Sequence, residues 1–142
     1  MLQEIAEKGV SKFMQSVGIG MSKYFNEKYV EKGSVFQGPY RAKIIDNDLY
    51  LRHASAYIQI KNAFELYPKG KSEALLNFDT AYKWATENPY ISLGDYAGIR
   101  SSPTFDKGIL GEIFTPSKYK SFARDYIFGR MPEIPKSEFE LE

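Results

Sequence analysis

Apolar residues recur every three or four positions from Leu2 to Tyr29, which is the spacing of one face of an α-helix. The pattern ends at Lys32-Gly33, and Gly18-Ile19-Gly20 interrupts it in the middle. Each glycine costs a helix about 1 kcal/mol relative to alanine, so two of them close together disfavour an unbroken helix. We therefore expect a long amphipathic helix with a bend or hinge at these glycines.

Apolar and polar residues alternate after the bend expected at Gly38-Pro39, and this period of two is typical of a half-buried strand. One face of the strand would carry Tyr40, Ala42 and Ile44, and the other face would carry Arg41 and Lys43. A lone strand pair is only marginally stable in water. We expect helices to cover this strand or hairpin, or its sheet partners to lie in another chain or segment.

The rest of the chain predicts helices separated by turns, each with a start or stop signal. Short polar side chains that cap backbone amides precede the second helix, and threonine followed by proline opens the last one. The expected helices run from Asp46-Asn47-Asp48 to Pro68-Lys69-Gly70, from Ser72 to Asn88-Pro89, from Ser92 to Tyr96, from Asp106 to Phe114, and from Thr115-Pro116 to Gly129. The predicted fold is mainly α with a small β element (α+β), in which helices pack on one strand or hairpin. We expect one domain over residues 1–130 and an acidic, flexible tail over residues 131–142.

Composition narrows the possible chemistry. The chain has 142 residues, no cysteine and one histidine, His53, and its apolar runs are too short to span a membrane. The lack of cysteine excludes disulfide scaffolds and thiolate zinc sites, and one histidine cannot form a two-histidine metal clamp. The acidic, polar start is unlike a secretory signal, so we expect a cytoplasmic protein without membrane contact.

Charge and aromatic content each leave two interpretations open. Residues 1–61 carry nine Lys or Arg against six Asp or Glu, whereas residues 62–142 carry ten against twelve. A basic front half fits contact with phosphates, and an ordinary solvated surface is the alternative. The 15% aromatic content could stack nucleobases or fill a small core. Arg41 and Lys43 are spaced suitably for phosphates if the strand forms.

Two neighbouring stretches resemble a known family. They are Tyr24-Phe25-Asn26-Glu27-Lys28-Tyr29 and Gly33-Ser34-Val35-Phe36-Gln37-Gly38-Pro39-Tyr40-Arg41-Ala42-Lys43. Both are similar to the REP-associated tyrosine transposases, which act on single-stranded DNA and have the HUH endonuclease fold. Weaker likenesses at residues 48–51 and 92–96 extend the resemblance over about residues 10 to 130. It implies the C-terminal half of such a transposase domain, with single-stranded or hairpin DNA as partner and a role in the recombination of a mobile element.

The chain departs from that family at its chemical centre. The family holds a divalent metal such as Mg²⁺ with a His-hydrophobic-His pair on an upstream strand, and this chain has only His53. The family's nucleophilic tyrosine, which forms a 5′-phosphotyrosine, aligns with Met21. Tyr24, one helical turn later, is the nearest substitute. Pro39 and Gln59 stand where the family has arginine and histidine.

We therefore expect a transposase-derived protein that binds DNA and does not cleave it alone. The resemblance and the charges point to five DNA-contacting residues, with Tyr24 as the candidate nucleophile and no metal ligand or cofactor in this chain. The five are Lys23, Asn26, Lys28, Arg41 and Lys43. Two alternatives stay open: a helical interaction module that forms a homodimer and has no DNA role, or one part of a split DNA-nicking enzyme completed by a histidine-bearing chain.

Overall fold

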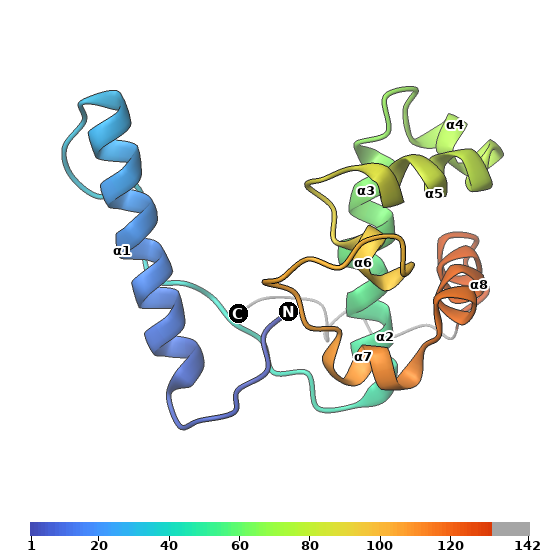
Figure 1. Cartoon of the computed structure of the whole chain (residues 1–142), viewed down its shortest axis with the longest axis horizontal. Helices are drawn as coiled ribbons and strands as arrows, with labels where there is room; N and C mark the ends of the chain where they lie inside the picture. Colours follow the sequence, from blue (N-terminus) through green and yellow to red (C-terminus); the bar gives the residue numbers. More distant parts are fainter. Residues whose placement is uncertain (132–142) are drawn as a thin grey trace. The chain divides into compact units, whose positions relative to one another are not determined.

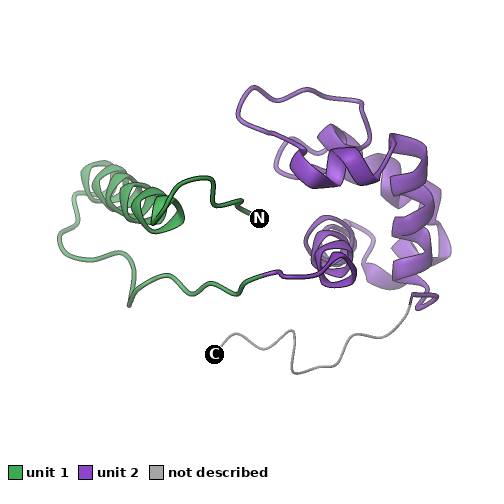
Figure 2. Cartoon of the chain, turned by 90° about the horizontal axis from the view of Figure 1, so that it is seen from below, with its two compact units in different colours: residues 1–44, 141–142 green, residues 45–140 purple. Residues whose placement is uncertain are grey.

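The computed structural model describes residues 1–131 of the chain. Contacts between backbone positions divide the described residues into two compact units, residues 1–44 and residues 45–131, drawn in green and purple in Figure 2. Residues 1–131 form helices and no strand, so the mainly helical prediction is confirmed and the small β element is not seen. The single domain predicted over residues 1–130 stays a prediction, and residues 132–142 of the predicted tail lie outside the described residues.

The first unit is built on one helix, α1 (Gly9–Tyr29), which forms a single continuous rod in Figure 1. It passes through Gly18 and Gly20 without interruption, so the expected hinge is not formed. A cost of about 1 kcal/mol per glycine is small for a helix of this length. Val30 then takes the left-handed conformation, with φ of 56°, and its N–H bonds back to the carbonyl of Asn26 to end the helix.

The predicted strand at residues 40–44 does not form among the described residues, and this segment is irregular. The physical reason is the lack of a paired strand, because a strand is held by hydrogen bonds to a neighbour and not by its own sequence. A side-chain contact links the segment to α1. The hydroxyl groups of Tyr40 and Ser11 lie 2.7 Å apart.

The second unit begins with a long helix, green in Figure 1, formed by α2 (Asp48–Ala56), the π-helical turn η1 (Tyr57–Lys61) and α3 (Asn62–Glu65). The side chain of Asn47 caps its start by accepting a hydrogen bond from the backbone N–H of Tyr50 at 2.8 Å. The predicted cap at residues 46–48 is therefore confirmed. The wider turn η1 was not predicted, because π-turns have no clear sequence signal.

Five shorter helices complete this unit: α4 (Lys71–Leu76), α5 (Phe78–Glu87), α6 (Leu93–Tyr96), α7 (Gly108–Ile113) and α8 (Pro116–Ile127). The continuous helix predicted from Ser72 to Glu87 is wrong, since Asn77 breaks it with φ of −120° and ψ of 55°. Asparagine is a weak helix former, and the side-chain amide of Asn77 donates to the carboxylate of Glu73 at 2.7 Å. The predicted cap of α8 is confirmed, because Thr115 accepts from the N–H of Lys118 at 3.4 Å.

The hydrophobic core lies in the second unit and centres on Tyr119 of α8. This side chain is fully buried, its ring stacks on Tyr96 at 5.2 Å, and its hydroxyl lies 2.7 Å from that of Ser55 in α2. Burial raises the pKa of the Tyr119 hydroxyl well above its usual value, so it stays protonated and the hydrogen bond persists. The other members of this core cluster come from every helix of the unit and from the turn after α3: Ala56, Ile60, Ala63, Phe64, Tyr67, Ala74, Phe78, Ala81, Tyr82, Ala85, Leu93, Tyr96, Leu110, Phe122 and Ala123.

We predict that Gly94→Ala destabilises the second unit. Gly94 in α6 packs so closely on α5 that an added Cβ would overlap the carbonyl oxygen of Thr86, and neither backbone can move without repacking. We expect a loss of about 2 kcal/mol or more in the free energy of unfolding, measured with urea. The matched control is Gly20→Ala, since no atom lies within 4 Å of its Cβ position and alanine favours the helix. Equal stability of the Gly94→Ala protein and its parent would contradict this close packing.

Candidate nucleic-acid interface

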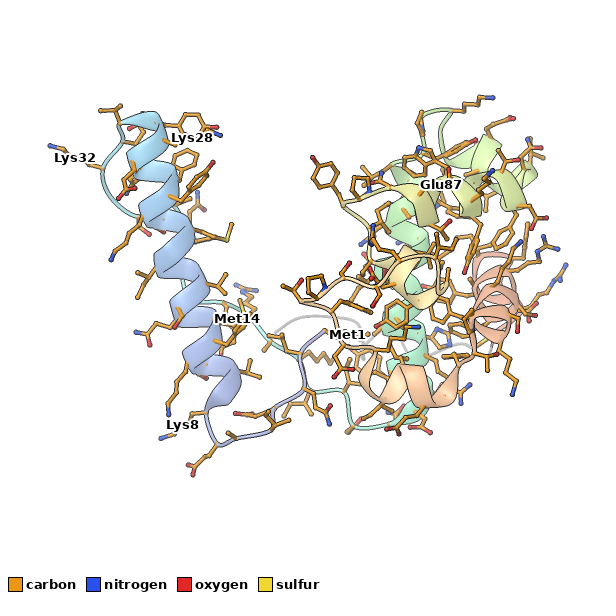
Figure 3. The ribbon with its side chains drawn as sticks, viewed as in Figure 1. Met1, Lys8, Met14, Lys28, Lys32 and Glu87 are labelled. Atoms are coloured by element: carbon orange, nitrogen blue, oxygen red, sulfur yellow. The ribbon has the colours of Figure 1, made fainter. Side chains whose placement is uncertain are left out.

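Helix α1 presents its side chains to solvent along its whole length. None of its residues is buried, and the ring of Tyr24 is 64% exposed. Figure 3 shows the side chains projecting around α1, with Lys8 near its first turn and Lys28 near its last. A helix of this kind has its surface available for another molecule.

The last turns of α1 gather aromatic rings around one ammonium group. The Nζ atom of Lys28 lies 5.5 Å from the ring centre of Tyr24 and 5.4 Å from that of Tyr29. The rings of Phe25 and Tyr29 are 4.7 Å apart. Exposed rings next to a cation are suited to stacking on bases while the cation contacts a phosphate. The structure thus brings together Tyr24 and Lys28, two of the predicted site residues.

Asn26 and Lys23 are placed differently. The side-chain amide of Asn26 donates to the carbonyl of Gly33 at 2.9 Å, and its backbone carbonyl accepts from the N–H of Glu31 at 3.0 Å. Asn26 therefore shapes the end of α1. Lys23 and Lys28 are five residues apart, which separates them by about 140° around a helix with 3.6 residues per turn. The two lysines thus face different directions, and a ligand on Lys28 would not also reach Lys23 without wrapping around α1.

Arg41 and Lys43 lie on the irregular segment that follows α1. Because the neighbouring Tyr40 contacts Ser11, this segment returns to the first half of the helix. Ser11 and Tyr24 are about 20 Å apart along the axis, at 1.5 Å per residue. The predicted basic residues therefore do not form one compact cluster, and they mark an extended surface along the unit.

The residues expected to carry catalytic chemistry are located as follows. Met21, which aligns with the family's tyrosine, is 55% exposed and carries no nucleophile, whereas Tyr24 offers an exposed hydroxyl. In the part of the chain that the structure describes, no group of three or more His, Cys, Asp or Glu side chains could hold a metal ion. His53 is buried in the second unit, with its ring edge-on to Tyr126 at 5.6 Å.

Asp95 and Arg100 form a buried ion pair in the second unit that the sequence did not predict. Asp95 is 2% exposed and accepts from the guanidinium of Arg100 at 2.8 and 3.1 Å and from the N–H of Ser102 at 2.7 Å. Burial alone would raise the pKa of Asp95, but these hydrogen bonds outweigh it and leave the pKa lowered. Arg100 also donates to the carbonyl of Ile91 at 2.7 Å, so the pair fixes the loop after α6.

A second group of charged residues was also missed by the sequence analysis. Asp79 at the start of α5 pairs with Lys120 at 2.7 Å and with Arg124 at 2.6 Å, both from α8. The available signal was the four-residue spacing of these two basic residues, which places them on the same face of a helix. The apolar stripe of that helix was predicted, whereas its polar face had no assigned partner.

Comparisons with known proteins add no relative, since no family model, curated protein or solved structure matches the chain. Within residues 1–131, no helix is both long and apolar enough to cross a membrane.

We predict that Asp95→Asn lowers stability at neutral pH and flattens its decline in acid. Folding lowers the pKa of Asp95. Its contribution to the free energy of unfolding is therefore complete above its pKa in the unfolded chain, near 4, and is lost as pH falls through its pKa in the folded protein. Replacing the charge should cost about 2 kcal/mol at pH 7. Urea unfolding at several pH values measures both effects. An unchanged decline in acid would show that other carboxylates govern it.

Proposed function

We propose that this chain binds single-stranded or hairpin DNA through α1 and the segment that follows it. The observation that carries the proposal is the exposed group on the last turns of α1, where Lys28 lies within 5.5 Å of the Tyr24 and Tyr29 rings. Bases of single strands are unpaired and stack on aromatic side chains, whereas those of a duplex are hidden. This arrangement therefore favours single-stranded DNA over duplex.

Charge supports the same surface. Residues 1–44 carry seven Lys or Arg against four Glu, and Arg41 and Lys43 lie on the segment that returns along α1. A strand that follows an extended basic surface releases counterions, so its affinity falls as salt rises. A DNA ligand also fits the predicted cytoplasmic location.

The resemblance to tyrosine transposases makes the proposal more specific. We infer a transposase-derived protein whose residues 40–44 pair as a strand with a sheet supplied by another chain or segment. The whole sequence has one histidine, and the described residues do not fit the divalent metal of that family, so we derive no cleavage step for this chain. A separate histidine-bearing chain would be needed for DNA nicking, with the Tyr24 hydroxyl as the proposed nucleophile.

We predict that changing Arg41 and Lys43 together to Ala weakens binding of a fluorescent single-stranded oligonucleotide, measured by anisotropy at about 50 and 200 mM salt. Loss of two phosphate contacts should reduce the slope of log affinity against log salt by about 1.4. The control changes Lys69 and Lys83 in the second unit to Ala, which removes the same charge. If the Arg41 and Lys43 variant binds like this control, the proposed surface is wrong.

Self-association is a second candidate function, favoured by the apolar residues of α1. Several large apolar side chains on this helix are at least 40% exposed, which is typical of a surface that meets another protein. They are Phe13, Ile19, Met21, Tyr24, Phe25 and Tyr29.

If self-association is the function, sedimentation should show a dimer that dissociates on dilution, and Phe13→Asp with Met21→Asp should abolish it. The same protein should then show no affinity for DNA at low salt. A monomer at every concentration would remove this candidate.

A further inference from the structure

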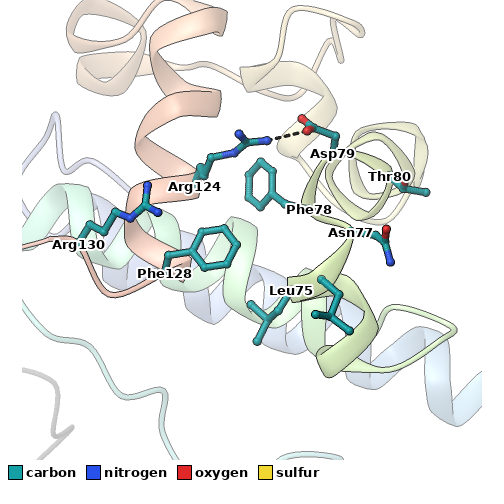
Figure 4. A pocket seen from close by; sticks show the side chains of 9 residues that line it. Leu75, Asn77, Phe78, Asp79, Thr80, Arg124, Phe128 and Arg130 are labelled. Atoms are coloured by element: carbon teal, nitrogen blue, oxygen red, sulfur yellow. Dashed lines mark hydrogen bonds and ion pairs between the residues drawn. The ribbon is translucent and has the colours of Figure 1, made fainter.

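A cavity of about 400 Å³ lies in the second unit where the end of α4, the start of α5 and the last turns of α8 meet. Figure 4 shows its lining, with apolar side chains of Leu75, Phe78 and Phe128 and charged side chains above them. Ligand pockets of small molecules have volumes of this order and combine apolar walls with a few polar groups. The cavity is thus large enough for a nucleotide.

At the edge of the cavity, two cations bind one carboxylate that lines it. One carboxylate oxygen of Asp79 lies 2.7 Å from the ammonium of Lys120, and the other lies 2.6 Å from the guanidinium of Arg124. Arg130, just beyond α8, also lines the cavity and lies 3.7 Å from Asp125. Asp79, Arg124 and Arg130 are thus the charged residues that line the cavity, and Lys120 binds Asp79 from outside this lining.

The pair of cations on Asp79 is accessible from solvent. The side chain of Asp79 is 64% exposed, and those of Lys120 and Arg124 are 46% and 43% exposed. An exposed carboxylate can turn into water at little cost, because such ion pairs contribute little to stability. A second anion can therefore replace it between the two cations.

The two arginines of the cavity also lie over aromatic rings. The guanidinium of Arg124 is 4.8 Å from the centre of the Phe78 ring, and that of Arg130 is 5.6 Å from the Phe128 ring. The two rings are 6.2 Å apart. Rings hold the guanidinium planes in place, and both guanidinium planes and phenyl rings are surfaces on which a nucleobase stacks.

We propose that this cavity binds a nucleotide, with its phosphate at the edge of the cavity, between Lys120 and Arg124 in place of the Asp79 carboxylate. The base lies over the apolar wall formed by Phe128 and Leu75, and Arg130 contacts the phosphate or the base edge from the side. A phosphate matches this site because guanidinium forks bind it through two parallel hydrogen bonds. All residues of this site belong to the second unit, so the proposal is independent of the DNA surface proposed for α1. Its nucleotide is either a free mononucleotide or one unit of a single strand.

The test uses the full chain and calorimetric titration with 5′-AMP, inorganic phosphate and a short oligothymidylate. Changing Arg124 and Arg130 together to Gln should weaken 5′-AMP binding about tenfold or more, since two charged contacts are lost. Asp79→Asn should strengthen it about threefold, because the competing carboxylate is gone. If Asp79 only stabilised the fold, Asp79→Asn would not increase the affinity for 5′-AMP.

The matched control is Arg52→Gln. The guanidinium of Arg52 also lies over a phenyl ring, 5.1 Å from the centre of Phe114, but Arg52 does not line the cavity. This variant should bind 5′-AMP like the parent. Thermal unfolding confirms that each variant is folded, and Arg130→Gln alone, at a side chain that is 66% exposed, provides a milder change.

The outcomes separate the possible ligands. Binding of 5′-AMP but not of the oligothymidylate indicates a free nucleotide, and competition between them indicates a unit of single-stranded nucleic acid. Equal affinity for phosphate and 5′-AMP overturns the role of the apolar wall, and no binding by the parent or by Asp79→Asn overturns the site. Loss of DNA binding on changing Arg41 and Lys43, with 5′-AMP binding intact, keeps the two proposals distinct.

Discussion

The packing of residues 45–131 depends on the burial of Tyr119. Its ring contacts those of Tyr96, Phe114 and Phe122 at 5.2, 5.4 and 5.9 Å, and its hydroxyl is paired with that of Ser55. These contacts fix how α8 is turned on the rest of the unit. Since Tyr119 points inward, the polar face of α8 is directed toward α5. The cavity forms because these two helices supply its charged lining. The fixed core thus determines where an exposed ligand site can form.

This unit has two aspartates that pair with basic side chains, and burial gives the two ion pairs different roles. Asp95 accepts two bonds from Arg100 at one oxygen and a third bond from Ser102 at the other, and it is buried away from any competing anion. Removing a partner there leaves an unpaired buried charge, which is costly. Asp79 also bridges cations, but it is open to water, so its partners can accept another ligand. The Asp95 pair therefore has a structural role, and the Asp79 pair is the one for which we propose binding.

Helix α1 differs because its side chains stay exposed, which leaves DNA and a second protein as competing partners for one surface. Tyr24 and Phe25 would stack on bases in the first case and pack on apolar groups in the second. The charge on Lys28 separates the two, since a cation beside the rings favours phosphate over an apolar partner. For this reason DNA binding is the first proposal and self-association the second.

Most of the helices and their starts follow from local sequence, because they depend on neighbouring residues. Asn47 and Thr115 cap as predicted, since a cap needs only a short polar side chain near the first free amides. The break at Asn77 and the partners of Asp95 are also local, but the apolar pattern does not show them, because polar side chains form both. The irregular form of residues 40–44 and the cavity depend on a strand partner or on residues far apart in the chain, which hydrophobic periodicity does not describe.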